Sequence, residues 1–396
     1  MSDKPLPPPI WILIVATATG PLALNIFVPS MPGLVDVFQT DYAMVQLALT
    51  SYLVAVGVAQ LVYGPISDRF GRRPALLGGL MVYAVANIAC MFAWSIESLI
   101  LARVLQAIGG CAGMVLGRAI VRDVYDRDRA ASAIAIITMA MAVAPAMGPA
   151  IGGLIDAQFG WQATFVVPLI VGLVVFCGAW FRLNETNVRP IPSIDVTAML
   201  RNYGSLLRSR AYIGYAANTA MSVGAFFSFI AGAPYVMIEV LHQGPEVYGF
   251  YFVLISIGYM TGNFLASRLS SKLGVDRMIP LGVGVSLVGS VTGFALMMMG
   301  LVTPMVVFLP MCVVAIGNGL SQPNGISGAV SVNPSIAGAA SGLMGFGQMV
   351  IGACFTVAVG YFQSDHDHAA MSTMILFATV CSLLFFILAR TAPRKE

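Results

Sequence analysis

The sequence predicts an all-α membrane protein with twelve transmembrane helices. Of its 396 residues, 58% are hydrophobic and only 9% are charged, and the mean hydropathy is +0.88. A soluble domain needs far more charge to cover its surface, whereas helices in a bilayer can be apolar nearly all round. Uncharged runs of about 20 residues, long enough to cross a bilayer, recur along the chain.

A short charged segment at residues 64–73 is the second observation behind this prediction. It holds Asp68, Arg69, Arg72 and Arg73 and lies between two long uncharged runs. A tight, basic connector between apolar runs is typical of a cytoplasmic loop that joins two membrane helices. We therefore expect a loop here between the second and third spans.

Six spans are expected in the first half of the chain. The first four cover residues 10–28, 43–63, 75–94 and 98–118. The fifth is expected before Asp156 and the sixth after it. A polar loop at 121–129 is expected after the fourth span. The first apolar run continues past its small-residue segment, so we interpret it as a retained span rather than a cleaved signal peptide.

The polar stretch at 182–210 is expected to link two halves. It contains five arginines together with Pro190 and Pro192, and residues 195–207 are expected to form a short surface helix. We place an N-terminal half at 1–182, a cytoplasmic linker at 183–210 and a C-terminal half at 211–396. Further spans are expected at 211–237 and 248–267, three within 278–364 separated by breaks at 300–304 and 323–334, and one between 368 and 390.

Charge asymmetry predicts the orientation. Every loop lysine and arginine falls on the side of residues 64–73. The opposite loops contain no lysine or arginine, and their charged residues are Asp36, Asp41, Glu97, Asp156, Glu239, Glu246, Asp365 and Asp367. Positive charge stays on the cytoplasmic side of a membrane. We therefore expect a multi-pass protein of the bacterial inner membrane with both termini in the cytoplasm.

An internal repeat divides the spans into two six-helix pseudo-repeats. The segment at 68–73 has a weaker echo at 271–277, and each lies between the second and third spans of its half. Two parallel six-helix repeats with a substrate cavity between them are a transporter architecture.

Three motifs follow one another along the first half. The first has the spacing Gly-x-x-x-Asp-Arg-x-Gly-Arg-Arg at 64–73, and the second is Arg-x-x-Gln-x-x-Gly-Gly at 103–110. The third alternates proline and glycine in the fifth span, at Pro145, Gly148, Pro149, Gly152 and Gly153. In this order they resemble motifs A, B and C of the major facilitator superfamily, motif C being the antiporter motif. The resemblance covers essentially the whole chain.

Two shorter segments resemble one branch of that superfamily. Asn25 with Pro29 and Pro32, and Arg118 with Arg122 and Asp123, are similar to segments of the bicyclomycin/chloramphenicol-resistance (Bcr/CflA) branch of drug:proton antiporters. The resemblance implies that branch's fold and alternating-access transport.

The first motif is expected to act in gating. Gly64 and Gly71 permit close approach of the chain, and Asp68 can accept charge-assisted hydrogen bonds. The resemblance implies that Asp68 latches the N-terminal half to the eleventh span, with Arg118 or Arg122 as the cationic partner. We assign Gly64, Asp68, Arg69, Gly71, Arg72, Arg118 and Arg122 to this latch. A solvated turn with topogenic charges is the alternative.

Arg103 and Gln106 are the expected coupling residues, together with Asp36. An arginine inside a span is costly and normally faces a cavity or a partner, and the resemblance gives Arg103 a part in proton coupling. The alternative is an arginine that extends to the headgroups. The proline and glycine spacing of the fifth span permits a kink and close helix packing, a pattern that a purely structural kink would share.

Asn25 departs from the drug-exporting branch, which usually carries an acidic residue in the first span. No predicted span contains aspartate or glutamate. Because an amide cannot titrate, coupling is expected to use Asp36 or Asp41 near the outer ends of the spans, or to be weak.

A cavity that is apolar, aromatic and sparsely polar is expected between the halves. Such a cavity suits neutral amphipathic compounds better than dications, which need a buried carboxylate. Each candidate also fits ordinary helix packing. The candidates are Asn25, Gln46, Tyr52, Asn218, Phe226, Phe227, Tyr251, Tyr259 and Asn263.

The predicted function is export of drug-like compounds, with chloramphenicol-type antibiotics favoured, driven by proton entry. A facilitator or importer of a small metabolite is the alternative. The expected partners are a small-molecule substrate, protons and the lipid bilayer; we expect no cofactor, no nucleic acid and a monomer. No catalytic constellation suggests an enzyme. The six cysteines are expected to be buried, and no metal site is expected, although His366, His368, Asp365 and Asp367 share one polar loop.

Overall fold

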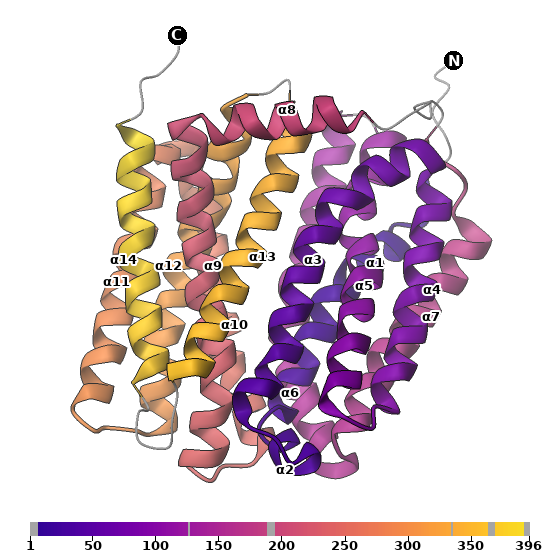
Figure 1. The fold of residues 1–396 in the computed structure, drawn as a ribbon. Helices are drawn as coiled ribbons and strands as arrows, with labels where there is room; N and C mark the ends of the chain where they lie inside the picture. The colour runs from indigo at the N-terminus through magenta and orange to yellow at the C-terminus, as the bar shows by residue number, and fades with distance from the viewer. Residues whose placement is uncertain (1–6, 126, 188–194, 334–335, 363–368, 392–396) are drawn as a thin grey trace. The chain divides into compact units, whose positions relative to one another are not determined.

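A computed structural model describes residues 7–125, 127–187, 195–333, 336–362 and 369–391. Within these ranges the chain forms fourteen α-helices and no strand (Figure 1). Eleven of the helices searched are long and apolar enough to cross a membrane. Helix α6 is a further long helix of 33 residues. The predicted all-α class is confirmed.

The chain divides into two compact units, the first being Met1–Ile194. Its short helix α2 follows α1 and precedes the long helices. The helices are α1 (Ile10–Phe27), α2 (Leu34–Phe38), α3 (Tyr42–Phe70), α4 (Arg72–Met91), α5 (Ile96–Val124), α6 (Arg127–Phe159) and α7 (Val166–Arg182).

The second unit is Asp195–Glu396. Its first helix, α8, matches the predicted surface helix: the carboxylate of Asp195 accepts the backbone N–H of Ala198 at 2.9 Å, and α8 lies across the ends of α9 and α13 (Figure 1). The helices are α8 (Val196–Leu207), α9 (Arg210–Tyr235), α10 (Pro245–Leu273), α11 (Val275–Met298), α12 (Pro304–Ser331), α13 (Ala337–Phe362) and α14 (Ala370–Arg390).

The predicted loop at 64–73 is mostly helix. Helix α3 continues through Pro65 to Phe70, and Gly71 alone joins it to α4. The expected polar loop at 121–129 is likewise short, because α5 runs to Val124 and α6 begins at Arg127. Hydropathy marks the part of a helix that lies in lipid, whereas the helical hydrogen bonds of these segments continue through polar residues beyond it.

The expected break at 323–334 is present between α12 and α13, but it begins later than predicted. Helix α12 runs through Pro310 and Pro323 and ends at Ser331. Neighbouring helices can satisfy the backbone groups that a proline frees inside a membrane protein, so proline does not end such a helix. The break at 300–304 is confirmed, since α11 ends at Met298 and α12 begins at Pro304.

The predicted repeat appears as two single-glycine junctions. Gly71 joins α3 to α4 with φ +101°, and Gly274 joins α10 to α11 with φ +76°. Both angles lie where an L side chain is strained, so glycine suits both positions. The junctions occupy equivalent places in the two units.

Small residues let α5 pack closely against α1. A Cβ atom on Gly113 would collide with the carbonyl of Ala16, and one on Gly110 would lie 3.1 Å from the Cα of Gly20. This contact fixes the depth at which Arg103, on the same helix, meets α1.

Two further expectations are settled differently. Cys90 and Cys111 are buried, but Cys177 and Cys354 are exposed on long apolar helices, so the prediction that all six are buried is wrong. The lipid surroundings of a membrane helix explain this exposure, because a small hydrophobic side chain can face the acyl chains. The predicted polar loop with His366 and His368 lies outside the described residues.

Candidate functional site

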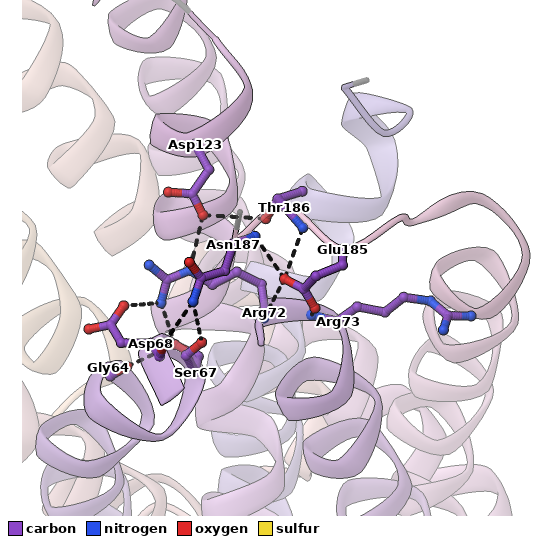
Figure 2. Close-up of polar contacts among 9 residues, drawn as sticks. All are labelled: Gly64, Ser67, Asp68, Arg72, Arg73, Asp123, Glu185, Thr186 and Asn187. Carbon is purple, nitrogen blue, oxygen red and sulfur yellow. Dashed lines mark hydrogen bonds and ion pairs between the residues drawn. The ribbon is translucent and has the colours of Figure 1, made fainter. Parts of the chain in front are cut away.

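Arg72 lies at the centre of a charged network at one end of the first unit (Figure 2). Its Nη1 atom is 2.6 Å from a carboxylate oxygen of Asp68, and its Nε donates to Asp123 at 3.0 Å. Nη1 also donates to the hydroxyl of Ser67 at 2.6 Å. The Arg72 side chain is only 13% exposed. Its contacts connect the last turns of α3 and α5 to the first turn of α4.

The carboxylate of Glu185 caps the start of α4. It accepts the backbone N–H groups of Arg72 at 2.9 Å and Arg73 at 3.1 Å. A negative charge at a helix N-terminus satisfies free N–H groups and complements the helix dipole. A Cβ atom on Gly71 would collide with this carboxylate, so the first motif requires glycine there for both space and conformation.

The two residues after Glu185 complete the network (Figure 2). The amide of Asn187 donates to the backbone carbonyl of Asp68 at 2.8 Å, and the hydroxyl of Thr186 donates to Asp123 at 3.3 Å. The segment that follows α7 thereby fastens α3, α4 and α5 together. Sequence reasoning missed these residues because they lie more than 100 positions from the first motif and form no pattern of their own.

Of the other residues assigned to the latch, Gly64 contacts this network through its backbone carbonyl, which accepts the hydroxyl of Ser67 at 2.9 Å (Figure 2). Arg118 donates from Nε to the carbonyl of Met114 at 3.2 Å, and Arg122 is exposed. Asp68 pairs with Arg72 here, and the expected partnership with Arg118 or Arg122 stays a prediction. Arg69 lies over the ring of Phe70 at 5.0 Å. A Cβ atom on Gly64 would meet nothing within 4 Å, so no close approach requires that glycine.

Arg103 is fully buried in a second polar network inside the first unit. Its Nη1 donates to the carbonyl of Ala23 at 3.0 Å and to the side chain of Gln106. Gln106 in turn donates to Asn87 at 2.6 Å. The network therefore joins α1, α4 and α5, and the alternative in which Arg103 extends to the headgroups is excluded.

Two aromatic rings cover the guanidinium of Arg103. Its Cζ atom is 4.6 Å from the ring centroid of Phe27 and 4.3 Å from that of Tyr52, both distances typical of cation–π contacts. The hydroxyl of Tyr52 donates to the carbonyl of Gly20 at 2.9 Å. Tyr52 was predicted as a cavity residue, whereas Phe27 and Asn87 were not singled out by the sequence.

The remaining expected coupling and antiporter residues lie on α1, α2 and α6 and at the start of α3. Asp36 is exposed on α2, and Asp41 caps α3 by accepting the N–H of Met44 at 2.7 Å. Asn25 is buried and donates to the carbonyl of Pro21 at 2.8 Å. A Cβ atom on Gly148 would lie 2.8 Å from that of Asn25, so the close packing predicted for the third motif is present. Pro145, Pro149, Gly152 and Gly153 lie on the same helix.

The expected cavity residues are placed within each unit separately. In the first unit, Gln46 is buried on α3. In the second, Asn218 donates to the backbone carbonyl of Ser382 at 2.9 Å, and the hydroxyl of Tyr259 donates to Gln322 at 3.0 Å. The other members pack nearby: Asn263 against Tyr259, Phe226 against Phe227 and Phe252, and Tyr251 against Phe308. A cavity shared by both units stays a prediction.

Among the described residues, each unit contains six long helices and a single-glycine junction at an equivalent place. Two six-helix repeats of this kind are typical of secondary membrane transporters. The chain belongs to the major facilitator superfamily, whose sequence signature matches residues 13–357. This family consists of transporters, as predicted, and not of enzymes.

Relatives and solved structures agree with this assignment. The chain is 31% identical over 317 residues to the chloramphenicol resistance protein of Pseudomonas aeruginosa, covering 79% of this chain and 72% of that one. It is 27% identical to the bicyclomycin resistance protein homolog of Haemophilus influenzae, covering 96% and 95% of the two chains. The crystal structure of a D-xylose–proton symporter matches with a TM-score of 0.77 at 13% identity, over 95% and 97% of the two chains, and supports the fold alone.

Proposed function

We propose that this protein exports small, mainly neutral amphipathic compounds such as chloramphenicol by alternating access, driven by proton entry. The names of its relatives support drug efflux, since one is a chloramphenicol resistance protein and another is a homolog of a bicyclomycin resistance protein. The structural observation that carries the proposal is the Arg72 network, which gives the first motif the form of a charged latch.

The latch works through Asp68. Its side chain is 44% exposed although it pairs with Arg72, so the rest of the carboxylate is accessible to further donors. We propose that donors at the end of α13 bind it in the outward-open state, when the cytoplasmic side is closed. Charge-assisted hydrogen bonds are strong enough to bias such a state and weak enough to exchange.

Coupling is proposed to use the Arg103 network. Arg103, Gln106 and Asn87 connect three helices, so a displacement of α1 at Ala23 is transmitted to α4 and α5. Because Asn25 cannot titrate, the proton-binding group is proposed to be Asp36 or Asp41. The proposed location is the bacterial inner membrane, with both termini in the cytoplasm and the protein acting as a monomer.

A drug-susceptibility panel in a pump-deficient bacterial host tests the proposal. Wild type is expected to raise the inhibitory concentration of chloramphenicol, and Asp68→Asn and Arg103→Ala to abolish the increase at equal membrane abundance. Arg201→Gln, at an exposed position on α8, is the matched charge-removal control and is expected to behave as wild type. A panel in which wild type protects against no compound would refute export.

A facilitator or importer of a small metabolite is the second candidate, and the buried amide of Asn25 in α1 favours it. Uptake into proteoliposomes distinguishes the two. Export coupled to protons is expected to follow an imposed pH gradient, whereas a facilitator equilibrates its substrate whether or not the gradient is present.

A further inference from the structure

Two donors of the buried Arg103 side chain have no acceptor. Nη1 is held by the carbonyl of Ala23 and by Gln106, but Nε and Nη2 are buried and make no hydrogen bond. Buried guanidinium N–H groups normally donate hydrogen bonds, because a buried donor without an acceptor costs free energy. The two unpaired atoms therefore point to a ligand.

The position of these atoms defines the shape of that ligand. Nε and Nη2 are neighbouring donors on one edge of the planar guanidinium, and their parallel N–H bonds match the two oxygens of one carboxylate. Phe27 and Tyr52 cover the group at 4.6 and 4.3 Å, which holds its plane in place. The edge that carries Nε and Nη2 is thus preorganised for a bidentate contact.

The charge of the site agrees with its shape. Arg103 is fully buried, and no carboxylate among the residues that the structure describes forms an ion pair with it. Its polar contacts, the Ala23 carbonyl and Gln106, are neutral. An incoming anion would therefore meet an uncompensated positive charge in a medium of low dielectric, where attraction is strong.

We propose that the Nε–Nη2 edge of Arg103 binds the carboxylate of a transported compound, so that the substrates include amphipathic organic anions with an aromatic or apolar body. This inference rests on the proposed export function and adds organic anions to its mainly neutral substrates. Because both donors are buried in this conformation, binding requires α1 and α3 to separate near Phe27 and Tyr52, as a transporter that changes state permits.

Calorimetric titration of the purified full-length protein tests the assignment. Benzoate is the probe and benzamide its neutral match, because the two share the ring and differ in the anionic group. Wild type is expected to bind benzoate at least tenfold more tightly than benzamide in a low-salt buffer that contains no carboxylate. Equal affinities in wild type would overturn the inference, and this comparison needs no variant.

Two substitutions separate charge from geometry. Arg103→Lys keeps the positive charge but lacks the paired donors, and Arg103→Gln removes both. Each is expected to lower benzoate affinity at least tenfold and to leave benzamide unchanged, which also shows that the variants are folded. Arg201→Gln is expected to change neither affinity. Unchanged benzoate binding in Arg103→Gln would overturn the proposal.

Chloride distinguishes an organic from an inorganic anion. Adding 100 mM chloride to this buffer (a chosen assay concentration, about the ionic strength at which exposed charges are screened) is expected to change benzoate affinity less than twofold. Loss of benzoate binding in chloride would overturn the assignment to an organic carboxylate. If wild type exports chloramphenicol but binds benzoate and benzamide alike, only this inference fails. If it exports nothing yet binds benzoate through Arg103, export fails and the anion site stands.

Discussion

The carboxylate of Glu185 caps the helix that begins at Arg72, 113 residues earlier in the chain, by accepting its backbone N–H at 2.9 Å (Figure 2). The same carboxylate accepts the N–H of Arg73 at 3.1 Å. The segment after α7 is therefore part of the structure that holds the first motif, although it lies outside that motif in sequence.

Glu185→Ala is expected to destabilise the first unit by about 1 kcal/mol, the usual effect of losing a helix cap. The N–H groups of Arg72 and Arg73 would lose their acceptor. Thermal unfolding in detergent measures the change. Glu246→Ala is the control, since Glu246 lies in the first turn of α10, in the second unit. A Glu185→Ala variant as stable as wild type would contradict the capping role.

Gly71→Ala is expected to impair transport far more than Gly274→Ala. Both glycines have positive φ, so both substitutions strain the backbone by about 1–3 kcal/mol. Only at Gly71 would the new Cβ atom also collide with the Glu185 carboxylate; at Gly274 nothing lies within 4 Å. Chloramphenicol susceptibility at matched membrane abundance reports the difference, and equal loss at both positions would count against the steric explanation.

Arg72→Lys is expected to lower stability by about 1–2 kcal/mol, because an ammonium cannot reproduce the geometry that bonds Asp68, Asp123 and Ser67 together. Asp123→Asn retains an acceptor oxygen toward Arg72 and is expected to cost less. Thermal unfolding of the single and double variants forms a cycle. Additive effects in the double variant would show that the two side chains do not interact.

Asn25→Asp is expected to make export more dependent on pH. The substitution places a titratable group at a buried position in α1, against α6 at Gly148. Export from proteoliposomes should then vary more steeply between pH 6 and 8 (a chosen assay range, about where perturbed buried groups titrate) than in wild type. Asn324→Asp, at a buried amide of α12 that donates to the carbonyl of Leu320 in the same helix, controls for a new acid of any kind. Identical pH profiles for wild type and Asn25→Asp would argue against this position in coupling.

Hydropathy predicted the helices because their apolar residues must face lipid wherever the helix crosses it. It did not predict where helices end, as α3 shows by continuing to Phe70 beyond its apolar part. The burial of Arg103 followed from its place inside an apolar run, but its partner Asn87 did not. Contacts such as Gln106 to Asn87 and Arg72 to Glu185 join distant segments, and a single sequence carries no signal for such pairs.

The junction at Gly71 leaves no slack between α3 and α4. Only one residue separates these helices of 29 and 20 residues, so a tilt of one helix is expected to tilt the other. Lengthening this junction by a few residues would shift Arg72 out of reach of Asp68 and Asp123. We therefore expect the protein to tolerate substitution of Gly64, inside α3, more readily than insertion of residues at Gly71. Surface turns usually tolerate insertions well, so this is the reverse of the usual case.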